Sequence, residues 1–458
     1  MFDTAINNGF VVDPANNIYS RLSLGLKDGR VAALSATPFD AGAAVEIIAA
    51  AGLLVVPGFI DMHMHEDRYD PAANSFDINI LDAMLRMGVT SVAGGNCGIG
   101  TCLPREYLAA ADRQGLPVNI ALYAAHAEIR KRYASDNYAP VSSEVIAQMA
   151  RDLDEQLAGG CLGVSFGLRY VPGTSREELH ALARVAARHG KLLAAHARDD
   201  AAHIHEAVRE LIDVAAEERV RVQVSHIGSM AAYGQMEEIL AALDAAVAAG
   251  LDLGLDCYPY NAFCTAIGSA TYDPGFLERY DIGYEAVEVC GGKYRGQRCT
   301  REIFDEVRRD TPEILAVAHV MKEHEVDMAL VHPRTILASD GILFNGLGHP
   351  RAAGSFPRFL RHYVKERGIL GLNEAVAKMT CLPARRLGFI EAGLKKGSLG
   401  VGDDADIVLI DFEEIRDLAD FAEPLAPPLG IRQVLLGGRT AVKQGKVKDN
   451  RLGRGLRV

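Results

Sequence analysis

The sequence lacks the features that direct a chain to membranes or nucleic acids. It has no apolar run of 18 residues, which a membrane-spanning helix would need. Its formal charge is -12, and no stretch of lysine and arginine provides the basic face that nucleic-acid binding requires. The first ten residues, MFDTAINNGF, also lack the basic start and apolar core of a signal peptide. We therefore expect a cytoplasmic protein with no membrane and no nucleic-acid partner.

The chain also lacks a cysteine framework. Its eight cysteines are irregularly spaced over 458 residues, so we expect them to be reduced rather than paired in disulfides. Apolar residues make up 49% of the chain and charged residues 24%, which is typical of a globular protein. This length suits either two or three ordinary domains or one large barrel with an appendage.

The two ends of the chain share a pattern that differs from the middle. Short apolar runs separated by glycine-containing turns occur before residue 55 and again after residue 397, which is typical of strands. We predict that residues 1–55 and 397–458 pair into one small β-sandwich domain. Residues 56–396 would then form a second, larger domain.

The middle of the chain alternates apolar runs with helical patterns. Eight such runs occur, at residues 53–60, 89–93, 118–124, 162–166, 192–195, 220–224, 251–255 and 335–338. Repeated strand and helix units predict a parallel sheet, and eight of them predict an α/β fold of the (β/α)8 TIM barrel type. About 80 residues separate the last two runs, too many for one crossover helix. We therefore expect an insertion at about residues 263–301, a lid-like segment over the barrel mouth or a rigid excursion.

Side chains that bind metals follow most of these runs. His63 and His65 leave the first strand end on the same side, because side chains i and i+2 of a strand point the same way. Later runs are followed by Cys97, His126, His196, His226, Asp256 with Tyr258, and Asp340. Each residue alone is compatible with ordinary packing or turn capping. Because barrel strand ends converge, histidine, cysteine and aspartate donors at one rim predict a metal site.

The motifs that carry these residues resemble those of the amidohydrolase superfamily, and within it the N-acyl-D-amino-acid deacylases, or D-aminoacylases. The family's GFID-x-H-x-H appears as GFIDMHMH, and its GVT-x-V-x-x-GNCGI appears as GVTSVAGGNCGIG. Further matches are Ser225-His226, DCYPY at 256–260, and the SDG, HPR and GSFPR segments within 339–358. The resemblance runs nearly from end to end. It implies zinc-dependent hydrolysis of the amide bond of an N-acyl-D-amino acid or close analogue, releasing a carboxylate and a free amino acid.

The resemblance also implies roles for the metal ligands. Many amidohydrolases bridge two metals with a carboxylated lysine after strand four, but residues 132–190 contain no lysine. In the deacylases a strand-two cysteine takes that place, matched here by Cys97. By similarity one tight zinc ion is held by Cys97, His196 and His226, and a second, weaker position is formed by His63, His65 and Asp340. Asp340 would also act as general base toward water and then protonate the leaving nitrogen, with His126 at most supporting the ligands.

The expected substrate-binding residues match the family less well. In the resembling enzymes an arginine, a lysine, a tyrosine and a serine hold the substrate carboxylate, and Arg351 and Tyr258 match two of them. Gly228 stands where the lysine would be, and Cys264 replaces the serine. Arg198 begins an Arg-Asp-Asp segment where the family has Arg-Asn-Glu. We expect Tyr258, Arg351, Arg198 and Cys264 to contact the substrate, and the alternative for Arg351 is a structural ion pair.

The sequence leaves two other functions open. A cyclic-amide hydrolase of the hydantoinase or dihydroorotase kind would share the same metal face, although such enzymes usually carry the strand-four lysine. A non-catalytic relative kept as an assembly scaffold would have lost ligands, and none of the six is missing. The acyl group, the number of metals and association into a homo-oligomer stay undetermined, and the expected partner is a small-molecule amide.

Overall fold

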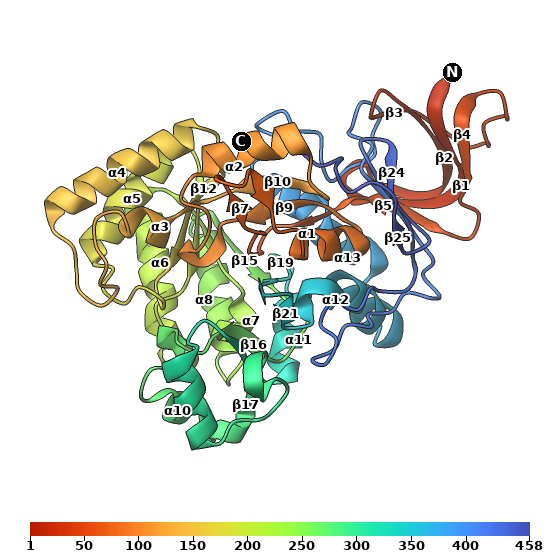
Figure 1. Ribbon diagram of the computed structural model, residues 1–458. Coiled ribbons are helices and arrows are strands. Elements are labelled where there is room, and N and C mark those ends of the chain that lie inside the picture. The colour runs from red at the N-terminus through yellow and green to blue at the C-terminus, as the bar shows by residue number, and fades with distance from the viewer.

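Eight strand positions form a closed barrel in the computed structural model, which describes all 458 residues (Figure 1). The strands are β6 (Phe59–Asp61), β9 (Val89–Gly94), β10 (Asn119–Leu122) with β11 (Ala124–Ala125), β12 (Gly163–Gly167), β13 (Leu192–His196), β14 (Arg221–Val224), β15 (Leu253–Cys257) and β19 (Thr335–Leu337). The ring closes where Met64 bridges Gly341 and where the N–H of Asp340 donates to the carbonyl of His63 at 2.8 Å. The eight apolar runs therefore predicted the barrel.

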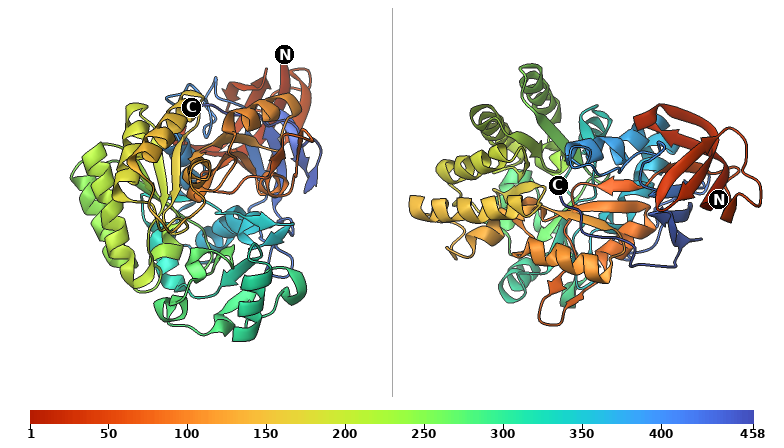
Figure 2. Two further views of the ribbon diagram at one scale, coloured as in Figure 1. Left: turned by 60° about the vertical axis from the view of Figure 1, so that its left-hand side comes forward. Right: turned by 90° about the horizontal axis from the view of Figure 1, so that it is seen from above.

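The barrel strands are apolar at nearly every position because both of their faces are buried. In β13, Leu192 and Ala194 pack into the barrel interior, whereas Leu193 and Ala195 pack outward against the helices. Figure 2 shows these helices arranged around the ring. They are α1 (Ile80–Arg86), α2 (Pro104–Gln114), α3 (His126–Arg130), α4 (Ser143–Ala158), α5 (Arg176–Arg188), α6 (Ile204–Glu218), α7 (Ile227–Ala231), α8 (Met236–Ala248), α11 (Glu323–Val331), α12 (Arg351–Arg358), α13 (Leu372–Met379) and α14 (Cys381–Arg386).

Strands from both ends of the chain form one nine-stranded sheet. They are β1 (Phe2–Asp13), β2 (Ile18–Lys27), β3 (Arg30–Ser35), β4 (Ala44–Ala49), β5 (Leu54–Pro57), β22 (Ile407–Ile410), β23 (Ile431–Leu436), β24 (Arg439–Lys443) and β25 (Lys446–Val447). Pairing of β5 with both β1 and β22 joins the two ends. The strands expected in a sandwich are thus hydrogen-bonded as a single sheet. Leu24 of β2, from the N-terminal part, and Leu435 of β23, from the C-terminal part, share one apolar core.

The first apolar run divides between the two parts of the molecule. Leu54–Pro57 lies in the terminal sheet, and only Phe59–Asp61 lies in the barrel. The break falls at Gly58, where an added Cβ would meet the Thr90 hydroxyl oxygen at 2.1 Å. The run at 53–60 is therefore two short strands rather than one.

The insertion builds a small sheet of its own. Its elements are β16 (Phe263–Ala266), α9 (Phe276–Tyr280), β17 (Val287–Val289), α10 (Arg301–Asp310) and β18 (Leu315–Ala318). Because β18 pairs antiparallel with both β16 and β17, the insertion extends beyond the expected end at residue 301. Two short hairpins, β7 (Tyr69–Asp70) with β8 (Ser75–Phe76) and β20 (Leu343–Phe344) with β21 (Leu347–Gly348), occupy other loops.

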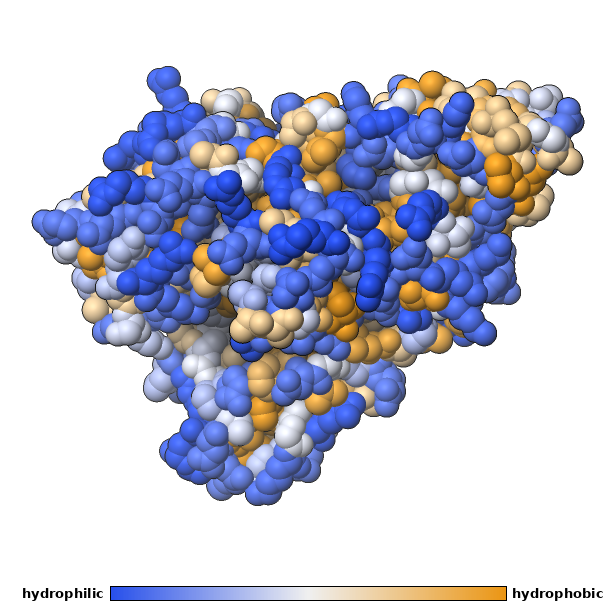
Figure 3. All heavy atoms as spheres, turned by 45° about the horizontal axis from the view of Figure 1, so that its top comes forward, coloured by the Kyte–Doolittle hydropathy of each residue, from blue (hydrophilic) through white to orange (hydrophobic).

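The surface agrees with the composition. Figure 3 shows a face covered mostly by hydrophilic residues, with an apolar area over the terminal sheet. None of the helices combines the length and the apolar character that crossing a membrane requires.

Candidate metal centre and active site

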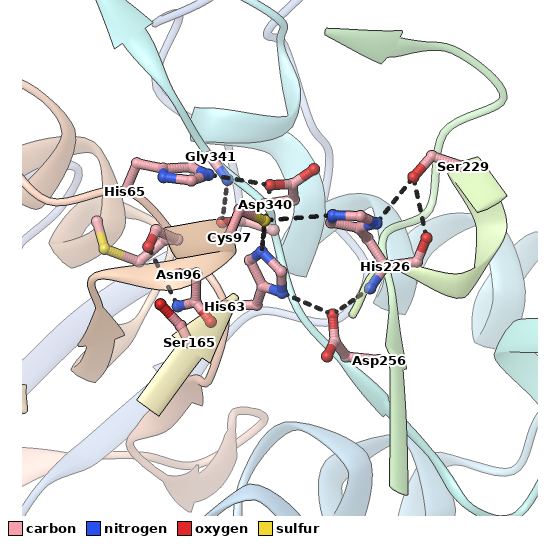
Figure 4. Close-up of polar contacts among 12 residues, drawn as sticks. His63, His65, Asn96, Cys97, Ser165, His226, Ser229, Asp256, Asp340 and Gly341 are labelled. Carbon is pink, nitrogen blue, oxygen red and sulfur yellow. Dashed lines mark hydrogen bonds and ion pairs between the residues drawn. The ribbon is translucent and has the colours of Figure 1, made fainter. Parts of the chain in front are cut away.

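Four of the expected metal ligands point at one another at the strand ends (Figure 4). The Sγ atom of Cys97 lies 3.3 Å from Nε2 of His63 and 3.3 Å from Nε2 of His226. Oδ1 of Asp340 lies 3.4 Å from Nε2 of His63. One donor atom from each of these four residues falls within 4.8 Å of the others. A thiolate, two imidazoles and a carboxylate are donors that Zn²⁺ accepts, so this set fits a zinc ion.

The other two expected ligands flank this group. His65 places Nε2 3.4 Å from Oδ1 of Asp340. The ring of His196 lies between those of Tyr170 and His226, with centroid distances of 4.6 and 4.5 Å. The structure thus brings all six residues together, but it groups His63 and Asp340 with Cys97 and His226 rather than in a separate set.

Three of these residues have backbone φ angles that residues other than glycine rarely adopt. The φ angles are 53° for Cys97, 34° for His226 and 48° for Asp340, all in the left-handed region. Such residues persist only where the surrounding contacts hold them, and they cluster at functional sites. The strand ends therefore present these donors in fixed positions.

Hydrogen bonds from two neighbouring elements hold the loop that carries Cys97. The Glu66 carboxylate accepts the N–H of Gly95 at 2.6 Å and that of Thr101 at 3.0 Å, one on each side of Cys97. Ser165 of β12 accepts the N–H of Gly98 at 3.1 Å and donates to the carbonyl of Gly95. The loop therefore lies against the end of strand four, which explains how a strand-two cysteine reaches the centre. Sequence reasoning missed both Glu66 and Ser165, and the only signal for Glu66 was its place directly after His63-Met64-His65.

Two side chains contact the Nδ1 atoms of His63 and His226, the ring nitrogens that do not face Cys97. Oδ1 of Asp256 lies 3.0 Å from Nδ1 of His63 and accepts the N–H of His226 at 2.8 Å. The Ser229 hydroxyl lies 3.0 Å from Nδ1 of His226. Partners of this kind fix which ring nitrogen faces a metal. Asp256 was noted at a strand end but given no role, and Ser229 was missed.

The neighbouring side chains favour the thiolate form of Cys97. Burial raises the pKa of the Cys97 thiol, but His63 and His226 outweigh it and hold that pKa well below its usual range. Burial lowers the pKa of His63, but Asp256 and Cys97 raise it well above its ordinary value. A thiolate beside positive charge is the form in which cysteine binds metals.

Asp340 is also held as an anion. Burial raises the pKa of its carboxyl, but the Arg351 guanidinium and the neighbouring histidines bring it well below its ordinary value. Nη1 of Arg351 lies 2.9 Å from Oδ2 of Asp340, and both side chains are almost fully buried. Asp340 therefore faces the metal ligands with one oxygen and Arg351 with the other.

Three of the expected substrate-binding residues lie together next to Asp340. Arg351 sits over the ring of Tyr258 at 4.5 Å, and its Nη2 donates to the carbonyl of Cys264 at 3.1 Å. The Tyr258 hydroxyl donates to the sulfur of Met321 at 3.8 Å. The ion pair with Asp340 shows that Arg351 has at least a structural role, as the alternative proposed.

Two other expected residues are held by acidic partners of their own. The Arg198 guanidinium is held by both oxygens of Glu210, at 2.8 and 2.9 Å, and it does not line the cavity beside the metal ligands. His126 instead lies 2.6 Å from Glu178, which also bonds Arg130 at 3.2 Å. Each of these two residues has a buried or partly buried carboxylate partner of its own, which the sequence pattern did not reveal.

The structure also explains the missing lysine. A Cβ added at Gly228 would meet Sγ of Cys257 at 2.8 Å and Cε of Met321 at 3.2 Å. A larger side chain at this position would have to displace packed neighbours. The packing around Gly228 therefore leaves no room for a lysine side chain.

A cavity opens next to three of the expected metal ligands, His196, His226 and Asp340. The barrel lines it with Tyr170, Asp200, Ser229 and Met230, and the insertion lines it with Phe263, Cys264, Thr265, Thr271 and Tyr280. Of the residues proposed to contact the substrate, only Cys264 lines it directly.

Comparisons with known proteins agree with this geometry. Two models described as the amidohydrolase family match residues 54–243 and 332–442. An N-acyl-D-glutamate deacylase from Alcaligenes xylosoxydans xylosoxydans is 33% identical, with 99% of this chain and 96% of that protein covered. A D-aminoacylase from the same organism is 30% identical, with 99% and 97% covered. The crystal structure of an N-acyl-D-glutamate deacylase from Bordetella bronchiseptica, with zinc and a phosphonate inhibitor, has a TM-score of 0.87 at 30% identity and covers 100% of both chains.

These full-length matches and the cluster of Cys97 with the histidines lead to the same assignment. The family resemblance seen in the motifs is confirmed. The chain belongs to the amidohydrolase superfamily, in its N-acyl-D-amino-acid deacylase (D-aminoacylase) family.

Proposed function

We propose that this protein is a metal-dependent hydrolase that cleaves the amide bond of an N-acyl-D-amino acid, releasing a carboxylate and the free amino acid. The observation that carries this proposal is the cluster of His63, Cys97, His226 and Asp340 at the strand ends. It occurs in a chain aligned nearly end to end with an N-acyl-D-glutamate deacylase.

The proposed cofactor is zinc. One tight ion would be held by Cys97, His196 and His226, and a weaker second position would be completed by His63, His65 and Asp340. When bound, zinc polarises the substrate carbonyl and lowers the pKa of water toward ~7. The short contact between Cys97 and His63 supports a shared centre rather than two independent sites.

Asp340 is the proposed general base and acid. Its carboxylate is ionised and therefore able to take a proton from the attacking water. It then gives that proton to the nitrogen of the scissile amide, because an amine leaves only after protonation. Arg351 fixes the carboxylate in place through Oδ2, which leaves Oδ1 turned toward the metal ligands.

The substrate carboxylate is proposed to lie near Arg351, Tyr258 and Cys264. Neither Nε nor Nη1 of Arg351 makes a hydrogen bond within the protein, and Nη1 faces the Asp340 carboxylate, so Nε is the donor proposed to serve a ligand. Arg198 is left out of this set because Glu210 occupies its guanidinium.

The insertion is proposed to act as the lid of this site. Its first strand and α9 supply Phe263, Cys264 and Tyr280 to the cavity wall, so the insertion covers the substrate position. The terminal sheet, proposed as a separate small domain of residues 1–55 and 397–458 and continued to Pro57 by β5, does not contribute to the cavity.

The direct test is an assay of the zinc-loaded protein. We expect free amine from N-acetyl or N-formyl D-amino acids, much less from the L-enantiomers, and loss of activity after chelation that added zinc restores. Turnover of hydantoins without turnover of any linear N-acyl-D-amino acid would overturn the proposal in favour of a cyclic-amide hydrolase.

A further inference from the structure

Apart from the expected metal ligands, the cavity lining carries one charged side chain, that of Asp200. The other lining residues are neutral, and no lysine or arginine lines the cavity. Asp200 follows β13 by four residues and lines the cavity together with Tyr280.

The Asp200 carboxylate is buried but only half satisfied. Its side chain is 4% exposed, and Oδ2 accepts the hydroxyl of Tyr280 at 2.7 Å. Oδ1 has no hydrogen-bond partner within the protein. Oδ1 forms an ion pair with Arg279, whose Nε lies 3.7 Å away, beyond hydrogen-bonding distance. A buried acceptor without a partner is costly, so a ligand that donates to Oδ1 gains a favourable contact.

The neighbouring charges do not cancel this preference. Arg169 is engaged by Asp199 at 3.1 Å, and Arg279 is shared between Asp199 and Asp200. Burial raises the pKa of Asp200 to about 6, so the carboxylate is an anion at neutral pH. An anionic substituent placed next to Asp200 in the cavity would meet a like charge across a desolvated space.

We propose that Asp200 determines substrate specificity by accepting a hydrogen bond from an amide or ammonium group of the substrate and by excluding a carboxylate there. This inference rests on the proposed deacylase function. It separates the chain from its 33% identical relative, which is an N-acyl-D-glutamate deacylase. The donor group can belong to the amino-acid side chain or to the acyl group. In either case the scissile amide still lies within the same cavity.

Two substrate series distinguish these sources. The side-chain series is N-acetyl-D-lysine, N-acetyl-D-glutamine, N-acetyl-D-leucine and N-acetyl-D-glutamate. The acyl series is D-leucine carrying a β-alanyl, an acetyl or a succinyl group. In one series kcat/KM should be roughly 10- to 100-fold higher for the donor substrate than for the carboxylate substrate.

The variant Asp200→Asn should bring the ratio of these two kcat/KM values close to one, chiefly by raising kcat/KM for the carboxylate substrate. Asp281→Asn is the matched control, because it removes the same charge from an exposed residue next to Tyr280 that does not line the cavity. Its backbone φ of 53° is one that asparagine also adopts. This control variant should leave the ratio within about threefold of that of the unmodified protein, the usual scatter of surface changes.

Each outcome decides something. Equal kcat/KM for donor and carboxylate substrates in both series, measured on the unmodified protein, would overturn the inference without any variant. An unchanged ratio in a zinc-loaded Asp200→Asn protein would also overturn it. Hydrolysis of N-acetyl-D-leucine reports separately on the proposed function, since neither its side chain nor its acyl group carries a charge. If neither N-acetyl-D-leucine nor any other substrate of the two series were hydrolysed, the deacylase assignment itself would be rejected.

Discussion

Replacing Glu66 by glutamine should weaken zinc binding although Glu66 is not a ligand. Its two oxygens accept the N–H groups of Gly95 and Thr101, which lie on either side of Cys97. A glutamine side chain has the same shape but ends in one carbonyl oxygen and one NH₂ group. One of the two backbone N–H groups would then bond a neutral oxygen, and the other would face the NH₂ group and have no acceptor. Hydrogen bonds to charged groups contribute about 1.5–3 kcal/mol and neutral ones about 1 kcal/mol, and an unpaired buried donor costs about 1–3 kcal/mol. The loop should therefore be destabilised by about 2–4 kcal/mol.

Part of this cost should appear as zinc affinity, because Cys97 is held with a left-handed φ of 53° that the relaxed loop would lose. We expect zinc to bind roughly 10- to 100-fold more weakly, the range seen when groups behind metal ligands are changed. Competition with a chromophoric chelator measures that affinity, and thermal unfolding of the zinc-free proteins measures stability.

Asp67→Asn is the matched control for this experiment. Asp67 is also a buried carboxylate next to the histidine motif, but its oxygens accept the N–H groups of Asn79, Ile80 and Leu81 at the start of α1. Its replacement should lower stability by a similar amount and leave zinc affinity unchanged. If Glu66→Gln bound zinc as tightly as the unmodified protein, or if Asp67→Asn weakened zinc equally, the argument that Glu66 holds Cys97 in place would be wrong.

Two further predictions concern catalysis and pH. Asp340→Ala should lower kcat for amide hydrolysis by about 10²- to 10⁴-fold while the protein stays folded, because it removes the proposed general base. Turnover at the original rate would contradict that role. Burial lowers the pKa of Lys378 to about 8 from an ordinary value of 10.5, so above pH 8 the unfolded chain binds more protons than the folded one and the free energy of unfolding rises. Relative to Lys378→Met, this free energy should increase by about 3 kcal/mol between pH 8 and 10.5 in chemical denaturation, and a constant difference would refute the assignment.

The barrel and its ligands were predictable because they depend on local patterns. Apolar runs mark the strands, and the topology of a barrel brings the residues after them to one rim. Cys97 and His226 could therefore be placed together from the sequence, and they lie 3.3 Å apart. The division of the run at 53–60 was not predictable, because it depends on how closely Thr90 approaches Gly58 from another strand.

The partners of the charged side chains were the least predictable part of the site. Arg198 stands next to a strand end, yet a carboxylate twelve positions along the chain, Glu210, takes its guanidinium. Asp200 looked like a minor departure from a motif, and only the fold places it in the cavity with Tyr280. Such pairings depend on side-chain distances between segments, which a strand and helix pattern does not contain.

The most direct test of the metal centre is X-ray absorption at the zinc edge of the purified zinc protein. The account predicts one sulfur neighbour at about 2.3 Å, from Cys97, together with nitrogen or oxygen neighbours at about 2.0–2.2 Å. The sulfur signal should disappear in Cys97→Ser. Zinc surrounded by nitrogen and oxygen alone, or a sulfur signal that persists in Cys97→Ser, would contradict the account.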